Sequence, residues 1–453
     1  MRHERAERVL AFDRDVERPG AEISPGMSAV APEDNALFAS HSADEGKRRE
    51  TSQPFAEFTL LGFLLDKSVD GGILSVVDPA GAIHRFGKRS GRDVTVRIAD
   101  RGALRRLAMN PALAVGETYM EGSLTIESGT LDDFLFLCTL AVDNLEQRPF
   151  MRAWRKLAKP FRALQQKNAI GAARENISSH YDISGEIYDL FLDADRQYSC
   201  AYFECGNETL EQAQEKKKRH IAKKLCLQPG MKVLDIGSGW GGLAIEMAQS
   251  VSGLEVTGLT LSHEQLAVSQ RRAAQAGLSD RVKFFLKDYR EETGIFDRVV
   301  CVGMFEHVGV SNYAAYFRQL KNLLAPSGVG LLHAIGRMDS PAETNGWVRK
   351  YIFPGGYCPA LSEVFAAIEK STLWATDVEI LRLHYAKTLH EWARRFEANR
   401  ARAAQIYDER FCRMWEFYLK ISEAAFRYSK LMVFQIQLTR ERDAVPLTRN
   451  YMC

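Results

Sequence analysis

The hydrophobic pattern of the chain is most regular in its middle third, where short apolar runs alternate with amphipathic segments. Runs that suit buried strands fall at 232–236, 255–259, 282–286, 296–302 and 328–334. Apolar residues at helical spacing follow at 264–275 and 313–324. Strands that alternate with helices are typical of a parallel sheet covered by helices on both faces. The pattern therefore predicts a doubly wound α/β sheet.

The first of these strands ends in a run of glycines. Residues 231–242 read MKVLDIGSGWGG, and a helical pattern occupies 243–249. Glycines such as Gly237 and Gly239 let a ligand approach the main chain, and the next helix directs free N–H groups into the same gap. Asp235 at the strand end can accept hydrogen bonds there. Taken alone, the loop suits a dinucleotide, a phosphate, a sulfonium nucleoside or a simple tight turn.

The residues at the end of the second strand help to distinguish between these candidate ligands. Thr260, Leu261 and Gln265 follow strand 255–259. A dinucleotide-binding protein usually has an acidic residue here, which grips the ribose. The glycine loop also lacks the third glycine at the usual dinucleotide spacing. Both features favour S-adenosylmethionine (SAM) over NAD.

Polar residues mark the ends of the predicted strands. In a doubly wound sheet, ligands bind outside the carboxyl ends of the strands. We therefore expect the residues at these ends to converge on one crevice. They are Asp235, Thr260, Asp288, Glu306 and His333.

Two different segments precede the sheet pattern. Residues 1–54 mix charges with Ser, Pro, Gly and Ala without periodicity, which predicts a disordered tail. Residues 55–146 predict a small α+β domain. Its expected elements are strands at 72–78 and 93–98 and helices at 103–107 and 131–145.

A basic segment at 147–174 joins the small domain to the catalytic domain that we expect over 175–453. The segment has eight basic residues and no acidic one, interleaved with apolar side chains such as Trp154 and Phe161. Such a segment can lie on an anionic lipid surface, where each Lys or Arg contributes about 1 kcal/mol. It can equally be a solvated helix packed on a neighbour and broken at Pro160, and the sequence leaves both interpretations open.

The end of the chain, at 338–453, predicts further helices and loops. Its aromatic residues recur at helical spacing, which favours a buried core over lipid contact. They include Trp392, Phe396, Phe411, Trp415, Phe417, Tyr418, Phe426 and Phe434.

Composition narrows the setting of the protein. The chain has 453 residues, enough for two or three domains, and a net charge of +2, which predicts no nucleic-acid partner. Its eight cysteines show no paired CxxC spacing, and no secretory signal precedes them. We therefore expect a reducing, cytoplasmic compartment and no metal site. No apolar run approaches the roughly 20 residues that span a bilayer, so membrane contact is expected to be peripheral.

Seven separated motifs resemble one family. They read NISSHYDISGEIYDLFLDADRQYSCAYF (176–203), QPGMKVLDIGSGWGG (228–242), VTGLTLSHEQ (256–265), GMFEHVG (303–309), LLHAIG (331–336), YIFPGG (351–356) and HYAKTLHEW (384–392). Together they closely resemble the cyclopropane-fatty-acyl-phospholipid synthases and the mycolic acid cyclopropane synthases. The likeness runs from about residue 55 to the end of the chain and is weaker before residue 176.

The resemblance implies a fold, a reaction and a location. The fold is the class I SAM-methyltransferase fold, and a smaller lipid-engaging domain precedes it in the phospholipid enzymes. The reaction transfers a methyl group from SAM to the cis double bond of an unsaturated membrane phospholipid and then closes a cyclopropane ring. The expected location is the cytoplasm, at the inner face of the membrane. The oligomeric state, a homodimer included, stays open.

The resemblance also implies two sites. A bicarbonate ion, acting in catalysis, would lie among Cys200 (through its backbone), Glu306, His333, Ile335 and Tyr385. SAM, with Asp288 and Tyr289 near its adenine, would contact Tyr198, Ser199, Gly237, Gly239, Thr260, Leu261, Gln265, Asp288 and Tyr289, to which the strand end adds Asp235.

Three positions depart from the family pattern. Ser238 replaces a frequent cysteine in the glycine loop, a small-for-small change that we expect to be neutral. Ser422 stands where the family often has a cysteine, shortly after the Tyr-Leu pair that begins at Tyr418. This serine argues against an obligatory thiol at that position. Glu186 occupies the position of a frequent asparagine, where an acid at a helix start is electrostatically acceptable.

The chemistry explains why such residues are needed. The sulfonium methyl is already electrophilic, so the protein must align the alkene and exclude water. Attack leaves a carbocation that aromatic faces stabilise by about 0.5–2 kcal/mol per contact. The aromatic candidates are Tyr181, Tyr198, Tyr202, Tyr385 and Phe305.

A base must then remove a proton before the ring can close. A protein carboxylate risks alkylation by the cation, whereas bound bicarbonate is replaceable. We expect Glu306 to accept from the protonated bicarbonate oxygen, and Tyr385 and His333 to donate to the others. Without the resemblance, His333 would suit a core histidine and Glu306 a helix cap.

Other functions fit parts of this pattern. A fatty-acyl C-methyltransferase would share the fold and donor but give a branched or methylene product without ring closure. A small-molecule methyltransferase would not need the basic linker or the small domain. A non-catalytic lipid-binding protein would not need the glycine loop together with Glu306, His333 and Tyr385.

Overall fold

The computed structural model describes residues 56–88, 91–146 and 183–452. The expected tail at 1–54, the basic segment at 147–174 and Tyr181 lie outside these residues. Residues Leu60–Cys453 form one compact unit, which contains two sheets. The division of the chain into a small domain and a catalytic domain stays a prediction.

The first sheet has four strands in the order β2-β1-β3-β4, with β1 and β3 parallel and the outer strands antiparallel to them. Two strands and two helices were predicted, whereas β2, β4, α2 and α4 were not. The strands are β1 (Gly72–Val77), β2 (Ile83–Gly87), β3 (Arg92–Ile98) and β4 (Leu124–Ser128). The helices are α2 (Ala56–Ser68), α3 (Arg101–Met109), α4 (Pro111–Glu121) and α5 (Leu131–Glu146).

Local sequence explains why α4 escaped prediction. Pro111 and Gly116 look like turn residues, but Pro111 stands at the helix start, where its missing N–H has no helical partner to lose. Gly116 lies against Trp347, since a Cβ there would be 2.4 Å from Nε1 of the indole. The glycine therefore serves close packing and not a turn.

The second sheet has seven strands in the order β10-β11-β9-β8-β5-β6-β7. The strands are β5 (Lys232–Ile236), β6 (Glu255–Thr260), β7 (Val282–Leu286), β8 (Phe296–Val302), β9 (Leu324–Arg337), β10 (Trp374–Ile380) and β11 (Leu431–Thr439). The five predicted strands, β5 to β9, are confirmed and run parallel. Strand β11 is antiparallel to both β9 and β10. The prediction of only helices and loops after residue 338 was therefore wrong.

The strand order places a crevice beside β5. The chain leaves β5 toward β6 and β7, and then returns to the other side of β5 with β8 and β9. Connections that diverge from one point leave a crevice at the carboxyl ends of the two central strands. The glycine loop after β5 and the residues after β8 meet at this switch point.

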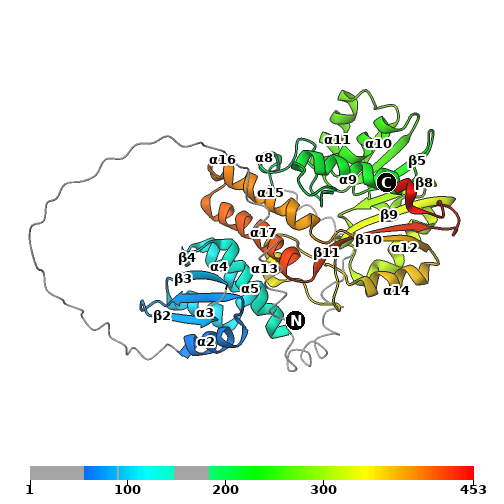
Figure 1. The fold of residues 1–453 in the computed structure, drawn as a ribbon. Coiled ribbons are helices and arrows are strands. Elements are labelled where there is room, and N and C mark those ends of the chain that lie inside the picture. Colours follow the sequence, from blue (N-terminus) through cyan, green and yellow to red (C-terminus); the bar gives the residue numbers. More distant parts are fainter. Residues whose placement is uncertain (1–55, 89–90, 147–182, 453) are drawn as a thin grey trace, which may run out of the picture. The chain divides into compact units, whose positions relative to one another are not determined.

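Helices cover both faces of this sheet (Figure 1). One apolar layer joins the sheet to α12 (Tyr313–Leu323) and α14 (Leu361–Ser371). The other joins it to α9 (Leu210–Lys224), α10 (Gly242–Ser250) and α11 (His263–Gln275). The doubly wound architecture is therefore confirmed.

The remaining helices are α8 (Gly185–Asp189), α13 (Gly346–Tyr351), α15 (His384–Ala398), α16 (Arg400–Ile406) and α17 (Glu409–Tyr428), with short 3-10 turns η1 (Tyr289–Glu291), η2 (Phe305–His307), η3 (Val310–Asn312) and η4 (Arg449–Met452). Helix α17 buries Trp415, Tyr418 and Phe426, as the aromatic spacing predicted. None of the helices in the described ranges is both long and apolar enough to cross a bilayer.

Candidate functional site

The glycine loop after β5 has a backbone that only glycine adopts easily. Gly237, Gly239 and Gly241 have φ angles of +79°, +54° and +84°. The N–H groups of Gly237 and Ser238 both donate to the carbonyl of Leu259, at 2.9 Å, which ties the loop to β6. The loop is therefore fixed against the neighbouring strand end.

This loop forms one wall of a pocket at the switch point. All ten residues that we assigned to SAM line it, and the structure thus brings the whole predicted set together. They are Tyr198, Ser199, Asp235, Gly237, Gly239, Thr260, Leu261, Gln265, Asp288 and Tyr289.

Hydrogen bonds hold several of these side chains in place. Thr260 Oγ1 donates to Gln265 Oε1 at 2.8 Å and accepts from the N–H of Ser262 at 3.1 Å. Asp288 accepts two bonds from the Arg290 guanidinium, at 2.8 and 2.6 Å. The pocket therefore presents oriented polar groups at the ends of two strands, β6 and β7.

Asp235 is a buried acid of the pocket wall. Its side chain is 2% exposed, and Oδ2 has no hydrogen-bond partner among the described residues. Burial raises the pKa of this carboxyl to about 7, although the positive charge of Lys217 opposes the shift. An unused buried acceptor beside a pocket fits a ligand that carries hydrogen-bond donors.

Glu306 lies in η2, directly after the wall residues Gly303 and Met304. Its Oε1 accepts the N–H of Ile335, on β9, at 2.6 Å, while Oε2 has no partner within the described residues. Burial raises the pKa of this carboxyl to about 7, and the bond from Ile335 opposes the shift. Since the side chain reaches across to β9, the structure favours a site residue over a helix cap.

His333 lies two residues before Ile335 on β9 and is buried. Gln435 Nε2 lies 3.1 Å from its Nδ1, and because an amide nitrogen only donates, Nδ1 accepts. Burial lowers the pKa of His333 to about 3, so the neutral ring carries its proton on Nε2. His333 is thus a fixed neutral donor, close to the pocket through the bond from Gly303 N–H to its carbonyl.

Cys200 and Tyr385 lie next to wall residues of the pocket, since Cys200 follows Ser199 in the chain and Tyr385 is linked to Tyr198 through one intervening ring. The thiol of Cys200 is buried, which raises its pKa and makes it a poor nucleophile. The ring of Tyr385 packs on Trp392, with 5.7 Å between centroids, and Trp392 packs on Tyr198 at 5.3 Å. The five residues assigned to bicarbonate therefore flank the SAM-assigned pocket without lining it.

Two of the aromatic candidates for cation stabilisation are engaged in packing with other rings. Phe305 is fully buried and stacks on Tyr313 in the core beneath the sheet. Tyr202 is held between the rings of His220 and His384, with 4.3 and 4.9 Å between centroids. The His384 ring that packs on Tyr202 comes from a distant segment, which spacing along the chain does not reveal, whereas Tyr313 follows Phe305 by eight residues.

Sequence reasoning also missed a buried lysine. Lys217, on α9, is 1% exposed and donates to Gln197 Oε1 at 2.6 Å and to Ser199 Oγ at 2.8 Å. It belongs to the run KKK, which is typical of a solvated face. Its spacing from Leu210, Ala213 and Ile221, all buried, places it on the inner face of the helix, and this was the available signal.

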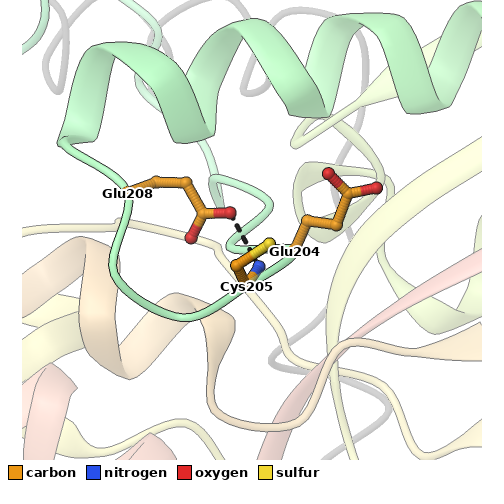
Figure 2. A group of neighbouring side chains, drawn as sticks. All are labelled: Glu204, Cys205 and Glu208. Carbon is orange, nitrogen blue, oxygen red and sulfur yellow. Dashed lines mark hydrogen bonds between the residues drawn. The ribbon is translucent and has the colours of Figure 1, made fainter.

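An acidic group outside the pocket resembles a metal site at first sight. The donor atoms of Glu204, Cys205 and Glu208 lie within 4.8 Å of one another (Figure 2). However, Glu208 accepts the N–H groups of Cys205 and Gly206, at 2.7 and 2.9 Å. Lys216 Nζ lies 2.9 Å from Glu204 and 2.8 Å from Glu208. Its ammonium already supplies the compensating charge, so the group stabilises the turn before α9.

The raised pKa of Glu306 predicts how its replacement changes stability with pH. A carboxyl whose pKa rises from an ordinary 4.5 to about 7 on folding opposes folding increasingly as pH rises through that interval. Glu306→Gln removes this penalty, which is on the order of 3 kcal/mol. We expect the melting temperature of the variant, relative to the parent, to rise between pH 5 and pH 8. A difference in melting temperature between variant and parent that stays constant from pH 5 to pH 8 would contradict the raised pKa of Glu306.

Comparisons with known proteins agree with this geometry. The family model described as mycolic acid cyclopropane synthetase matches residues 169–436. The cyclopropane-fatty-acyl-phospholipid synthase of Escherichia coli is 37% identical over 347 residues, which cover 76% of this chain and 87% of that protein. The tuberculostearic acid methyltransferase UfaA1 of Mycobacterium tuberculosis is 37% identical over 350 residues, with 74% and 81% covered.

Solved structures support the same fold. The mycolic acid cyclopropane synthase CmaA1, solved with S-adenosylhomocysteine (SAH), matches with a TM-score of 0.56 and 33% identity over 58% of this chain and 97% of that one. Coclaurine N-methyltransferase, solved with SAH, matches with a TM-score of 0.61 at 20% identity, over 72% of this chain and 98% of that one, and so supports the fold alone. The prediction of a class I SAM-methyltransferase fold is confirmed.

Proposed function

The chain belongs to the mycolic acid cyclopropane synthetase family of SAM-dependent methyltransferases, and from this premise we propose that it makes cyclopropane fatty acyl chains. The substrate would be the cis double bond of an unsaturated phospholipid, to which the enzyme adds a methylene unit from SAM. The observation that carries the proposal is the group of Glu306, Ile335 and His333 directly behind the pocket wall, in which the two titratable side chains are buried.

The residues present fit SAM. Asp235 has an unused buried oxygen, the glycine loop leaves the main chain open, and Gln265 and Asp288 stand at adjacent strand ends. The ten SAM-assigned wall residues would hold the ligand. When bound, SAM supplies an electrophilic methyl group. The part of the chain around the pocket aligns this group and keeps water out, which is the main task when the nucleophile is an alkene.

The residues present also fit a small oxyanion. Glu306 Oε2 has no partner in the described ranges, and the Nε2–H of His333 is a neutral donor. Glu306, His333, Tyr385 and the backbone of Cys200 would hold bicarbonate. When bound, bicarbonate supplies the base for ring closure. Since the Ile335 N–H is already donated to Glu306, we assign Ile335 to the orientation of this carboxyl.

The aromatic cluster beside Tyr198 suits the positive charge that forms on the acyl chain. Tyr198 Oη lies 2.8 Å from Tyr418 Oη, and the rings of Tyr188 and Trp392 lie 5.3 Å from that of Tyr198. Aromatic faces attract a cation by about 0.5–2 kcal/mol each. Tyr198 and Tyr385 remain our candidates for this role.

Contact with lipid would come from the small domain. Leu60 and Phe63, on α2, and Val142, on α5, are half exposed or more, at 50%, 62% and 54%. Asn144 donates to the carbonyl of Ser68 at 3.0 Å, which brings the ends of the two helices together. We propose that these apolar side chains enter the membrane surface, and that the protein works at the inner face of the membrane.

A second function keeps the pocket and changes the product. One relative is named a methyltransferase of tuberculostearic acid. A fatty-acyl C-methyltransferase would use the same SAM pocket and give a branched or methylene chain without ring closure.

Product analysis tests the proposal and separates the two functions. The purified protein is incubated with labelled SAM, bicarbonate and vesicles of unsaturated phospholipid. Ring closure adds one carbon and two hydrogens and removes the alkene protons from the NMR spectrum. A product that retains alkene protons, or one that gains four hydrogens with the added carbon when a reductant is supplied, favours the second function, and no label in the lipid rejects both.

A further inference from the structure

Helix α9 places a buried lysine beneath the pocket. Lys217 is 1% exposed, and it makes no ion pair with any residue in the described ranges. Its hydrogen bonds to Gln197 and Ser199 both go to neutral oxygens. Burial of a charge without a carboxylate partner is expensive, and such groups are found where function retains them.

The bonds of Lys217 fix the pocket segment 197–199 from below. Gln214, one turn earlier on α9, donates to the carbonyls of Gln197 at 3.2 Å and Ser199 at 3.0 Å. Gln197 is oriented at both ends of its amide, since Oε1 accepts from Lys217 and Nε2 donates to Asp195 at 2.9 Å. Helix α9 therefore holds both the backbone and the side chains of this wall.

The bond to Ser199 also decides which way the hydroxyl acts. An ammonium group has only donors, so Ser199 Oγ must accept in this bond. The single proton of the hydroxyl is then left for another acceptor. Ser199 is half-buried and lines the pocket. The pocket wall thus offers an oriented donor, with a positive charge 2.8 Å behind it.

The complementary ligand group is an anionic acceptor. Resting on the proposed function, SAM offers one such group, the carboxylate of its methionine part. We propose that Lys217 is a positioning residue that polarises Ser199 toward this carboxylate. It does not touch the ligand. It determines the direction of the Ser199 proton and adds charge behind it.

Calorimetric titration of the full-length protein with two ligands tests this. SAM carries the carboxylate, and decarboxylated SAM lacks only that group. In Lys217→Met, we expect the affinity for SAM to fall at least about tenfold, or 1.4 kcal/mol, and that for decarboxylated SAM to change less than about threefold. A merely structural role would weaken both ligands equally, and that result would overturn the proposal.

A second variant keeps the test decisive if Lys217→Met folds poorly. Ser199→Ala must show the same selective loss, and the double variant must lose no more than Ser199→Ala alone. Two results would reject the proposal that Lys217 acts through Ser199. One is that the affinity losses of the two single variants multiply in the double variant; the other is that Ser199→Ala discriminates between SAM and decarboxylated SAM as the parent does. If the parent protein binds SAM more tightly than decarboxylated SAM but these variants leave both affinities unchanged, the proposed function stands and only this inference fails.

The adjacent lysine of α9 supplies a matched control. Lys218 is also buried, but its ammonium pairs with Asp195 at 2.8 Å and Glu246 at 3.7 Å. Lys218→Met therefore removes a buried charge from the same helix without touching Ser199. We expect its ratio of SAM to decarboxylated SAM affinity to equal that of the parent. An altered ratio would mean that any charge loss on α9 has this effect, against a specific role for Lys217.

Discussion

Glu306→Gln is expected to lower turnover at least about tenfold while SAH still binds. The amide can accept the N–H of Ile335, as the carboxyl does at 2.6 Å, so the local fold should persist. It cannot hold or share a proton as Glu306 does, whose pKa burial raises to about 7. General acid–base groups typically contribute a factor of about 100 to 10,000. The measurement is the rate of label transfer from SAM into lipid at saturating SAM.

The control for Glu306 is a carboxylate with a similar bond outside the pocket. Glu363, on α14, accepts the N–H of Ala360 at 3.0 Å and the hydroxyl of Tyr357 at 2.8 Å. Glu363→Gln should keep turnover within about twofold, since no catalytic role is assigned to it. Parent-like turnover in Glu306→Gln would remove this carboxyl from the mechanism. Loss of SAH binding would instead assign it to the SAM pocket.

Gly237→Ala is expected to weaken SAH binding at least about tenfold. The residue has φ of +79°, and a Cβ would lie 2.9 Å from Cβ of Met304, on the facing wall. Left-handed backbone costs an alanine roughly 1–2 kcal/mol, and the contact must shift Met304 or the loop in addition. Met304 and the glycine loop both line the pocket. A shift of either one to relieve the strain therefore changes the shape of the site and weakens ligand binding. Calorimetry with SAH measures the loss.

Gly277→Ala separates this effect from backbone strain alone. Gly277 has φ of +68°, but nothing lies within 4 Å of a Cβ built there, and it follows α11 outside the pocket. We expect a loss of about 1 kcal/mol in the free energy of unfolding and unchanged SAH affinity. Equal SAH affinity in Gly237→Ala and the parent would show that the loop does not contact the ligand.

Strand prediction depended on a continuous apolar run in the local sequence, and β2 and β10, which have no such run, were missed. Strands β5, β6, β8 and β9 were found because apolar layers cover both faces of each, which leaves continuous apolar runs, whereas the edge strand β7 was found from its own apolar run, VKFFL. Strand β10 reads WATDVEI, in which Trp374 and Ala375 are exposed and the only buried residue is Asp377, and β2 reads IHRFG with no buried residue. These two edge strands carry little pattern of their own, so their pairing is decided by partners elsewhere in the chain.

The site shows the same division. The ten SAM-assigned residues could be named because each follows a strand end or belongs to a motif, and parallel strands bring their ends together. The aromatic residues could not be sorted in this way. The ring of Phe305 stacks on Tyr313, and the ring of Tyr202 stacks on His220 and His384.

The sequence by itself determined the doubly wound sheet, the glycine turn and the pocket at its switch point, since periodicity and glycine conformation are local properties. Only the tertiary structure decided that Ile335 orients Glu306, that Gln435 sets the tautomer of His333, and that Lys217 is buried beneath Ser199. These contacts join segments 18 to 102 residues apart. Their geometry depends on how whole elements pack, and no short stretch of chain encodes it.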